Sequence, residues 1–189
     1  MHNIIIESSA RHVHLSQADL DTLFGKGYAL NNVRELSQPG QYLTEEKVRI
    51  EGPRGAIDRV SILGPVRPAT QIEVSFTDAR VLGVAPPIRQ SGDVTGGACV
   101  KIVGPQGEVP VCDSCIVAMR HIHMIPETAR QLGLRDGQLV SVKVPGDRGM
   151  TFHQTPVRVS EKFADRMHID YDEANAAGLT GEVMGEIVV

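Results

Sequence analysis

The sequence lacks tryptophan and is poor in aromatic residues, and these shortages exclude some classes of protein. Only 4% of the 189 residues are aromatic, which argues against a surface that stacks nucleic-acid bases. The 19 Lys and Arg residues are scattered, and the net charge is −4. No basic stripe is therefore present to follow a phosphate backbone, and we expect no nucleic-acid partner.

Long apolar runs are also missing. None approaches the roughly 20 residues that a membrane-spanning helix requires. The opening residues 1–7 lack the basic start of a secretory signal. We therefore expect an intracellular protein without a membrane anchor. The length allows one domain or two small ones, with enough residues to bury a core.

Cysteine is scarce, with three in the chain: Cys99, Cys112 and Cys115. The odd number indicates reduced thiols rather than a framework of disulfide bonds. The segment from Cys112 to Cys115 could form half of a zinc site or a redox pair. A structural zinc would need two more ligands, and Cys99 supplies only one more thiol. We expect instead small core residues on a connecting strand.

One motif occurs twice in the sequence. Arg11-His12-Val13-His14 returns about 109 residues later as Arg120-His121-Ile122-His123. Each copy follows an apolar run and precedes a short helical pattern. Because successive strand residues point to opposite faces, both imidazoles of a His-x-His pair face the same way. A single pair is common and carries little information. Two pairs that pack together would supply four nitrogen donors, and imidazole is the commonest protein ligand for zinc.

A third histidine occurs in the same context. His168 ends a predicted strand, and Asp170 with Glu173 three residues later predicts the start of a capped helix. We therefore expect His168 to be a fifth metal ligand. His2 and His153 lack this context, and we expect them to be surface residues.

Short strands separated by Gly and Pro turns account for most of the remaining sequence. The pattern favours a small barrel or sandwich in the middle of the chain. The first strand, over residues 3–9, is expected to carry the first His pair at its end. Short helices are expected after Ser16, Pro126 and Asp170. Further strands are predicted over residues 46–51, 57–63, 71–76, 79–82, 100–103, 115–119, 139–144, 156–160 and 182–189.

Two further side chains are candidates for a site. Gln71, Glu73 and Ser75 share one face of a predicted strand, where a carboxylate could orient metals. An exposed, half-polar strand explains the spacing at least as well. Arg67 precedes this strand at a Pro-bounded turn, and Arg is suited to bind phosphate or carboxylate with two hydrogen bonds. The polar turn at residues 36–41 suits a loop over a site, although we expect a plain surface turn.

Four motifs, in order, resemble the PduL-type phosphate acyltransferases (phosphate propanoyltransferases, a class of phosphotransacylase). They are RHVHLS at 11–16, GPVRPATQIEVS at 64–75, RHIHM at 120–124 and HIDYDEAN at 168–175. The resemblance runs from Ile5 to the C-terminus. It implies an enzyme that interconverts a short-chain acyl-CoA, propanoyl-CoA or acetyl-CoA, and phosphate with acyl phosphate and CoA.

The resemblance also implies a fold and roles for particular residues. The fold is mainly β, with two small β-barrels and short capping α-helices. One barrel takes residues 1–10 and 119–189, the other takes residues 11–118, and the active site lies between them. The resemblance implies two zinc ions per chain, a phosphate-binding arginine and a CoA-facing asparagine. One zinc would be bound by His12 and His14, and the other by His121, His123 and His168. Glu73 would lie at the metals, Arg67 at the phosphate and Asn175 on the CoA side.

The resemblance extends to assembly and location. It implies a homodimer. Family members that enter bacterial microcompartments carry an N-terminal amphipathic helix, whereas this sequence begins almost at its first strand. We therefore expect a cytoplasmic enzyme, with a microcompartment as the alternative location.

The residues alone leave two other classes of function open. A metal-dependent hydrolase would activate water with the same histidines and carboxylate, and it would not require phosphate. A non-catalytic, metal-stabilised scaffold would bind zinc tightly and show no turnover. No residue can be assigned to an acyl pocket, so the preference between acetyl and propanoyl groups stays open.

Overall fold

Two closed barrels of six strands each make up the computed structural model, which describes residues 2–189. The chain divides into two compact units. Unit 1 contains the residues up to Ala10, Ser37–Pro39 and Met119–Val189, and unit 2 contains Arg11–Leu36 and Gly40–Ala118. The predicted fold class, mainly β with two small barrels and short helices, is confirmed. Within residues 2–189, no helix has the length and apolar character needed to cross a bilayer.

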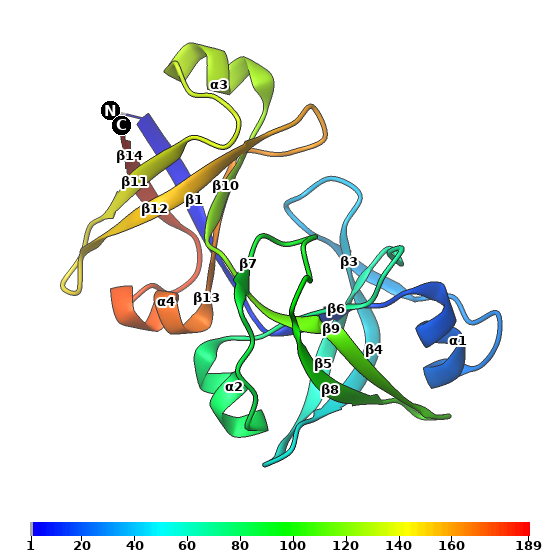
Figure 1. Cartoon of the computed structure of the whole chain (residues 1–189). Helices are drawn as coiled ribbons and strands as arrows, with labels where there is room; N and C mark the ends of the chain where they lie inside the picture. The colour runs from blue at the N-terminus through cyan, green and yellow to red at the C-terminus, as the bar shows by residue number, and fades with distance from the viewer. Residues whose placement is uncertain (1) are drawn as a thin grey trace. The chain divides into compact units, whose positions relative to one another are not determined.

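The barrel of unit 1 combines the first strand with the last third of the chain. β1 pairs in parallel with β13 and antiparallel with β14, and the strand order is β1-β13-β10-β12-β11-β14. Figure 1 shows the blue first strand beside the strands of the C-terminal part. The described elements of this unit are β1 (His2–Ser9), β10 (His121–Met124), α3 (Pro126–Leu132), β11 (Leu139–Val144), β12 (Met150–Val159), β13 (Arg166–Asp170), α4 (Tyr171–Ala177) and β14 (Val183–Val188).

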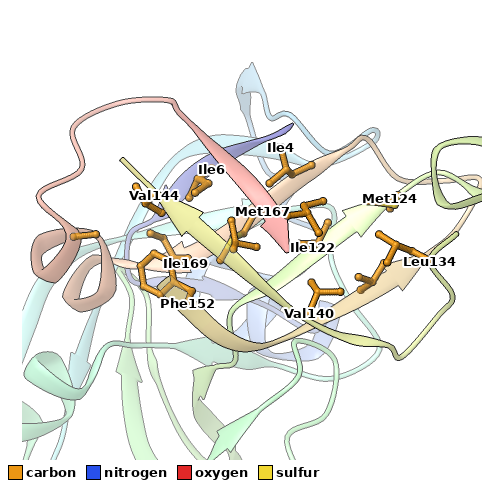
Figure 2. Close-up of a cluster of buried hydrophobic side chains, with 14 of the residues drawn as sticks. Ile4, Ile6, Ile122, Met124, Leu134, Val140, Val144, Phe152, Met167 and Ile169 are labelled. Carbon is orange, nitrogen blue, oxygen red and sulfur yellow. The ribbon is translucent and has the colours of Figure 1, made fainter. Parts of the chain in front are cut away.

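Apolar side chains from every strand fill this barrel. Residues of alternating strand positions point inward, and Figure 2 shows Ile6, Val144 and Ile169 gathered in the interior with Phe152. Their burial removes apolar surface from water, which is the main force that holds such a barrel together. The buried members include Ile4, Ile6, Ile122, Met124, Val140, Val142, Val144, Phe152, Val157, Met167, Ile169 and Ile187.

Gly185 of β14 lies where this core leaves no space. A Cβ built there would lie 2.7 Å from Cδ1 of Ile6 and 2.7 Å from Cγ1 of Val142. Gly185→Ala should therefore force these side chains out of position and lower the free energy of unfolding by about 1–3 kcal/mol. Urea unfolding measures this loss. The exposed neighbour Met184 provides the control, since Met184→Ala should change stability by only about 0.5 kcal/mol. Equal stability of the two variants would contradict the packing argument.

The barrel of unit 2 closes because β8 pairs with both β4 and β9. The ring runs β4-β5-β2-β6-β9-β8, and β3 and β7 extend it at β4 and β9. Its core includes Val13, Ile62, Ile72, Ile102 and Cys115, all fully buried. The described elements are β2 (His12–His14), α1 (Gln17–Phe24), β3 (Asn32–Glu35), β4 (Tyr42–Glu51), β5 (Ala56–Gly64), β6 (Gln71–Glu73), α2 (Phe76–Leu82), β7 (Ile88–Arg89), β8 (Ala98–Val103) and β9 (Glu108–Ala118).

The prediction of a strand at residues 79–82 is wrong, because these residues form the second half of α2. Ser75 caps this helix and forms a capping box with Asp78, and Gly83 ends it in the left-handed conformation. These local hydrogen bonds outweigh a short β-like pattern. The preceding strand therefore ends at Glu73 rather than at Phe76.

The first His pair does not lie at the end of the first strand. β1 ends at Ser9 in unit 1, and the pair lies on β2, which belongs to unit 2. The second copy shows the same break, since β9 ends at Ala118 in unit 2 and β10 begins at His121 in unit 1. Each pair thus lies on a short strand of its own, directly after the chain passes from one unit to the other.

The expectation of reduced cysteines is wrong for two of the three. Cys99 and Cys112 form a disulfide bond across β8 and β9. A β-bulge explains the pairing, because the register of these strands shifts between Ala98 and Val100 and Asp113 has a positive φ of 49°. Cys115 is a free, buried residue, as expected for a small core side chain.

The turn at residues 36–41 is more than a surface turn. Its residues Ser37–Pro39 belong to unit 1, although the chain on both sides belongs to unit 2. Gln38 is buried, and its side chain exchanges two hydrogen bonds with the backbone of Ala164, at 3.0 and 3.2 Å. The turn is therefore anchored on unit 1.

Candidate functional site

Three side chains of unit 2 bring their donor atoms together. His12 and His14 of β2 and Glu73 of β6 have ligand atoms that all lie within 4.8 Å of one another. β2 and β6 pair antiparallel with His12 opposite Glu73, and Nε2 of His12 lies 3.5 Å from Oε2 of Glu73. The three residues are 5%, 2% and 9% exposed. Two imidazoles and one carboxylate thus form a buried set of metal-ligand type.

Neighbouring groups orient these side chains. Nδ1 of His14 lies 3.1 Å from the carbonyl oxygen of Leu63, so this nitrogen donates and Nε2 remains for another partner. Oε1 of Glu73 accepts hydrogen bonds from Gln71 at 2.6 Å and from Ser91 at 2.7 Å. Oε2 is therefore the oxygen that faces His12. Such outer hydrogen bonds hold the ligands of a metal site in place.

The electrostatics favour the metal-binding forms of two of these residues, His14 and Glu73. Burial lowers the pKa of His14 well below its usual range, and the neighbouring His12 and Arg67 act in the same direction. Burial by itself would raise the pKa of Glu73. The interactions that lower this pKa, of which the attraction to His12 is the largest, outweigh burial, so the pKa is lowered. A neutral imidazole and an ionised carboxylate are the forms that bind a metal.

Arg67 lies near this cluster. It is half-buried, and its backbone N–H donates to the carbonyl oxygen of Leu15, 2.9 Å away, directly after β2. Its positive charge acts on both His14 and Glu73. Arg67 therefore pairs through its backbone with the segment that follows β2, close enough for its charge to influence two of the predicted ligands.

The second cluster lies in unit 1. His121 and His123 of β10 and His168 of β13 have donor atoms within 4.8 Å of one another, because β10 and β13 pair with His121 opposite His168. Nδ1 of His121 lies 2.8 Å from the carbonyl oxygen of Met119. Nε2 of His168 is buried and makes no hydrogen bond within the described residues. It pairs with Oε2 of Glu7 at 3.4 Å, a contact too loose to satisfy a buried nitrogen, which therefore fits a metal ligand.

The two clusters repeat one arrangement of elements. A His-x-His strand pairs antiparallel with a strand that carries the third ligand, and a short helix with a capping box follows. In unit 2 the third ligand is Glu73, and in unit 1 it is His168. The sequence analysis identified the repeated motif but missed the role of its arginines. Arg11 pairs with Asp78 of α2 at 2.8 Å, and Arg120 pairs with Glu173 of α4.

The remaining predicted residues lie outside both clusters. Asn175 lies exposed on α4, the helix that follows His168. His2 and His153 are exposed, and Nδ1 of His153 is 2.8 Å from the hydroxyl of Ser141. The cysteines contribute to neither cluster. The candidate metal ligands are thus one set of three in each unit, buried in unit 2 and with one half-buried member in unit 1.

Comparisons with known proteins agree with the motifs. Residues 5–180 match the family model described as phosphate propanoyltransferase. Proteins named phosphate propanoyltransferase from Thermotoga maritima and Clostridioides difficile are 52% and 48% identical over 183 and 185 residues, covering 96% and 98% of this chain and 87% and 88% of theirs. A third, from Lachnoclostridium phytofermentans, is 50% identical over 95% of this chain and 83% of its own. The chain belongs to the phosphate propanoyltransferase family and is an acyltransferase.

Proposed function

We propose that this chain transfers a short acyl group between coenzyme A and phosphate, with one zinc ion held in each cluster. Family membership supports acyl transfer to phosphate. The observation that carries the proposal is the buried His12, His14 and Glu73 set with the charge of Arg67 beside it. A metal-ligand set and a phosphate-binding cation are two features that suit this transfer, because each can offset the negative charge that develops in it.

Zinc suits both sets of donors. Each cluster offers three protein ligands of the imidazole or carboxylate type, which is the usual number in catalytic zinc sites. When bound, zinc would act as a Lewis acid that stabilises negative charge on the departing sulfur and on the reacting oxygens. Three protein ligands leave a coordination position for substrate, which a purely structural site does not need.

The chain's own residues would position the reactants. An oxygen of phosphate attacks the carbonyl carbon of the thioester, the carbon–oxygen bond forms, the carbon–sulfur bond breaks, and CoA leaves as a thiolate. Arg67 would hold the phosphate through two parallel hydrogen bonds and offset charge as the tetrahedral intermediate forms. Because phosphate is itself a competent nucleophile, correct placement supplies much of the rate. No side chain of the chain needs to form a covalent intermediate.

Other side chains would serve the same reaction indirectly. Gln71 and Ser91 occupy Oε1 of Glu73, which directs Oε2 toward the metal position. Asn175, exposed on α4, would contact coenzyme A. We also propose a homodimer, which light scattering would measure, and a cytoplasmic or microcompartment-enclosed location, which cell fractionation would distinguish.

A thiol-release assay tests the proposed function. Purified protein is mixed with propanoyl-CoA or acetyl-CoA, with and without phosphate, and its metal content is determined in parallel. We expect release of CoA that requires phosphate, formation of acyl phosphate, and about two zinc ions per chain. Release that ignores phosphate would show a metal-dependent hydrolase, and bound zinc without release would show a scaffold. The two acyl-CoA substrates differ by one methylene, so their preference should correspond to about 1–3 kcal/mol at most.

A further inference from the structure

Glu7 is a carboxylate beside the three-histidine cluster that the motifs do not include. It lies on β1, which pairs in parallel with β13 so that Glu7 is opposite His168. Its Oε2 lies 3.4 Å from Nε2 of His168, the nitrogen that makes no hydrogen bond within the described residues. The two side chains are only 21% and 22% exposed. A partly buried negative charge therefore faces a predicted metal ligand.

The carboxylate of Glu7 is held in place from two sides. The hydroxyl of Ser37 donates to Oε2 at 2.5 Å, and Nε of Arg166 donates to Oε1 at 3.0 Å. Ser37 comes from the turn that Gln38 anchors to the backbone of Ala164. A side chain fixed by two charge-assisted hydrogen bonds presents its charge in one position.

The internal repeat shows what this charge replaces. The spacing that relates the two His-x-His motifs relates Glu7 to Ile116, and both residues lie on a strand parallel to the one that carries the third ligand. In unit 2 the third ligand is acidic and its neighbour Ile116 is apolar and fully buried. In unit 1 the order is reversed, with His168 as the ligand and Glu7 as its neighbour. Each cluster thus has one carboxylate, which lies 3.5 Å from a histidine Nε2 in unit 2 and 3.4 Å in unit 1.

We infer that Glu7 is a positioning residue for the metal of the three-histidine cluster, where its carboxylate supplies the negative charge that Glu73 supplies in the other cluster. This inference rests on the proposed metal function. Three neutral imidazoles leave the charge of a divalent ion uncompensated in a buried site, and a fixed carboxylate offsets it. The contact is to Nε2 of His168 itself, so the carboxylate lies beside the coordinating nitrogen and acts on the bound ion through its charge.

Zinc affinity tests this inference without reference to turnover. A chain carrying His12→Ala and His14→Ala retains only the three-histidine cluster, and competition with a chromophoric chelator measures its zinc affinity. Adding Glu7→Gln should weaken zinc binding about 10–100-fold. The metal-free protein should lose some stability, since Gln keeps the shape of the side chain but not its ion pair with Arg166, and circular dichroism should show that it stays folded. Unchanged affinity in the folded Glu7→Gln protein would overturn the inference and leave Glu7 as a packing residue.

Two further variants keep the result interpretable. Glu186→Gln is the matched control, because Glu186 lies on β14 at the other side of β1 and its loss removes the same charge from the same barrel without loss of affinity. Ser37→Ala is used if Glu7→Gln fails to fold, since it frees the carboxylate while keeping its charge. It should weaken zinc binding less than Glu7→Gln, and wild-type affinity in this variant would again contradict the inference. Failure of the parent chain to bind zinc would overturn both the inference and the metal function on which it rests.

Discussion

Replacing His121 with alanine is expected to reduce bound zinc from about two ions to about one per chain and to abolish phosphate-dependent release of CoA. His121 is one of three ligand candidates in its cluster, and its Nδ1 is directed to the carbonyl of Met119. Without its ring the cluster offers two imidazoles, fewer than the three protein ligands that catalytic zinc sites use. Metal analysis of the purified protein and the thiol-release assay measure the two effects.

A histidine outside both clusters provides the control. His2→Ala makes the same chemical change at an exposed position, and it should keep both zinc ions and full activity. Circular dichroism should show that His121→Ala remains folded, because the residue removed lies at a barrel strand rather than in the apolar core. Full activity after loss of one zinc ion would show that the three-histidine metal does not take part in transfer.

The five histidine candidates could be predicted from local signals in the sequence, whereas Glu73 was assigned to the metals only through the family resemblance. The His-x-His pairs repeat in one context, and His168 precedes a capped helix with Gly178 at its end. The register that places His121 opposite His168, and His12 opposite Glu73, could not be predicted. Register depends on which strands pair across long stretches of chain, and a one-residue shift would turn the same side chains to the other face.

The two errors have different physical causes, one a local signal that was overlooked and the other a feature of strand pairing. The capping box at Ser75 and Asp78 was present in the sequence, and the analogous signal at Asp170 and Glu173 was used correctly. The disulfide of Cys99 and Cys112 depends on a bulge between β8 and β9, which a count of cysteines cannot reveal.

The contribution of Glu7 also needed the fold. The acidic residue becomes notable only when β1 is seen to pair with β13. Its alignment with Ile116 through the internal repeat was already available in the sequence, but other positions of the repeat also exchange a carboxylate for an apolar side chain, so the strand pairing was needed to single it out. A position where one copy of a repeat has a charged residue and the other an apolar residue is a candidate for a site, and strand pairing then tests it.

Arg67→Ala should lower kcat/KM for phosphate by about 10²–10³-fold, mainly through a higher KM for phosphate, while zinc content stays unchanged. The guanidinium is not among the predicted metal ligands, but its charge acts on both His14 and Glu73, so a phosphate bound there would meet the arginine and the metal together. Initial rates at varied phosphate concentration measure the effect, and saturation with acyl-CoA separates it from coenzyme binding.

Arg67→Lys separates charge from geometry at the same position. Lysine keeps the positive charge but cannot form the two parallel hydrogen bonds of a guanidinium, so it should restore only part of the activity. Arg54→Ala is the matched control, because Arg54 is an exposed arginine of the same unit with no proposed role. A KM for phosphate that is unchanged in Arg67→Ala would remove Arg67 from the phosphate site. Full recovery of activity with lysine would instead show that a positive charge is sufficient and that the two parallel hydrogen bonds are not needed.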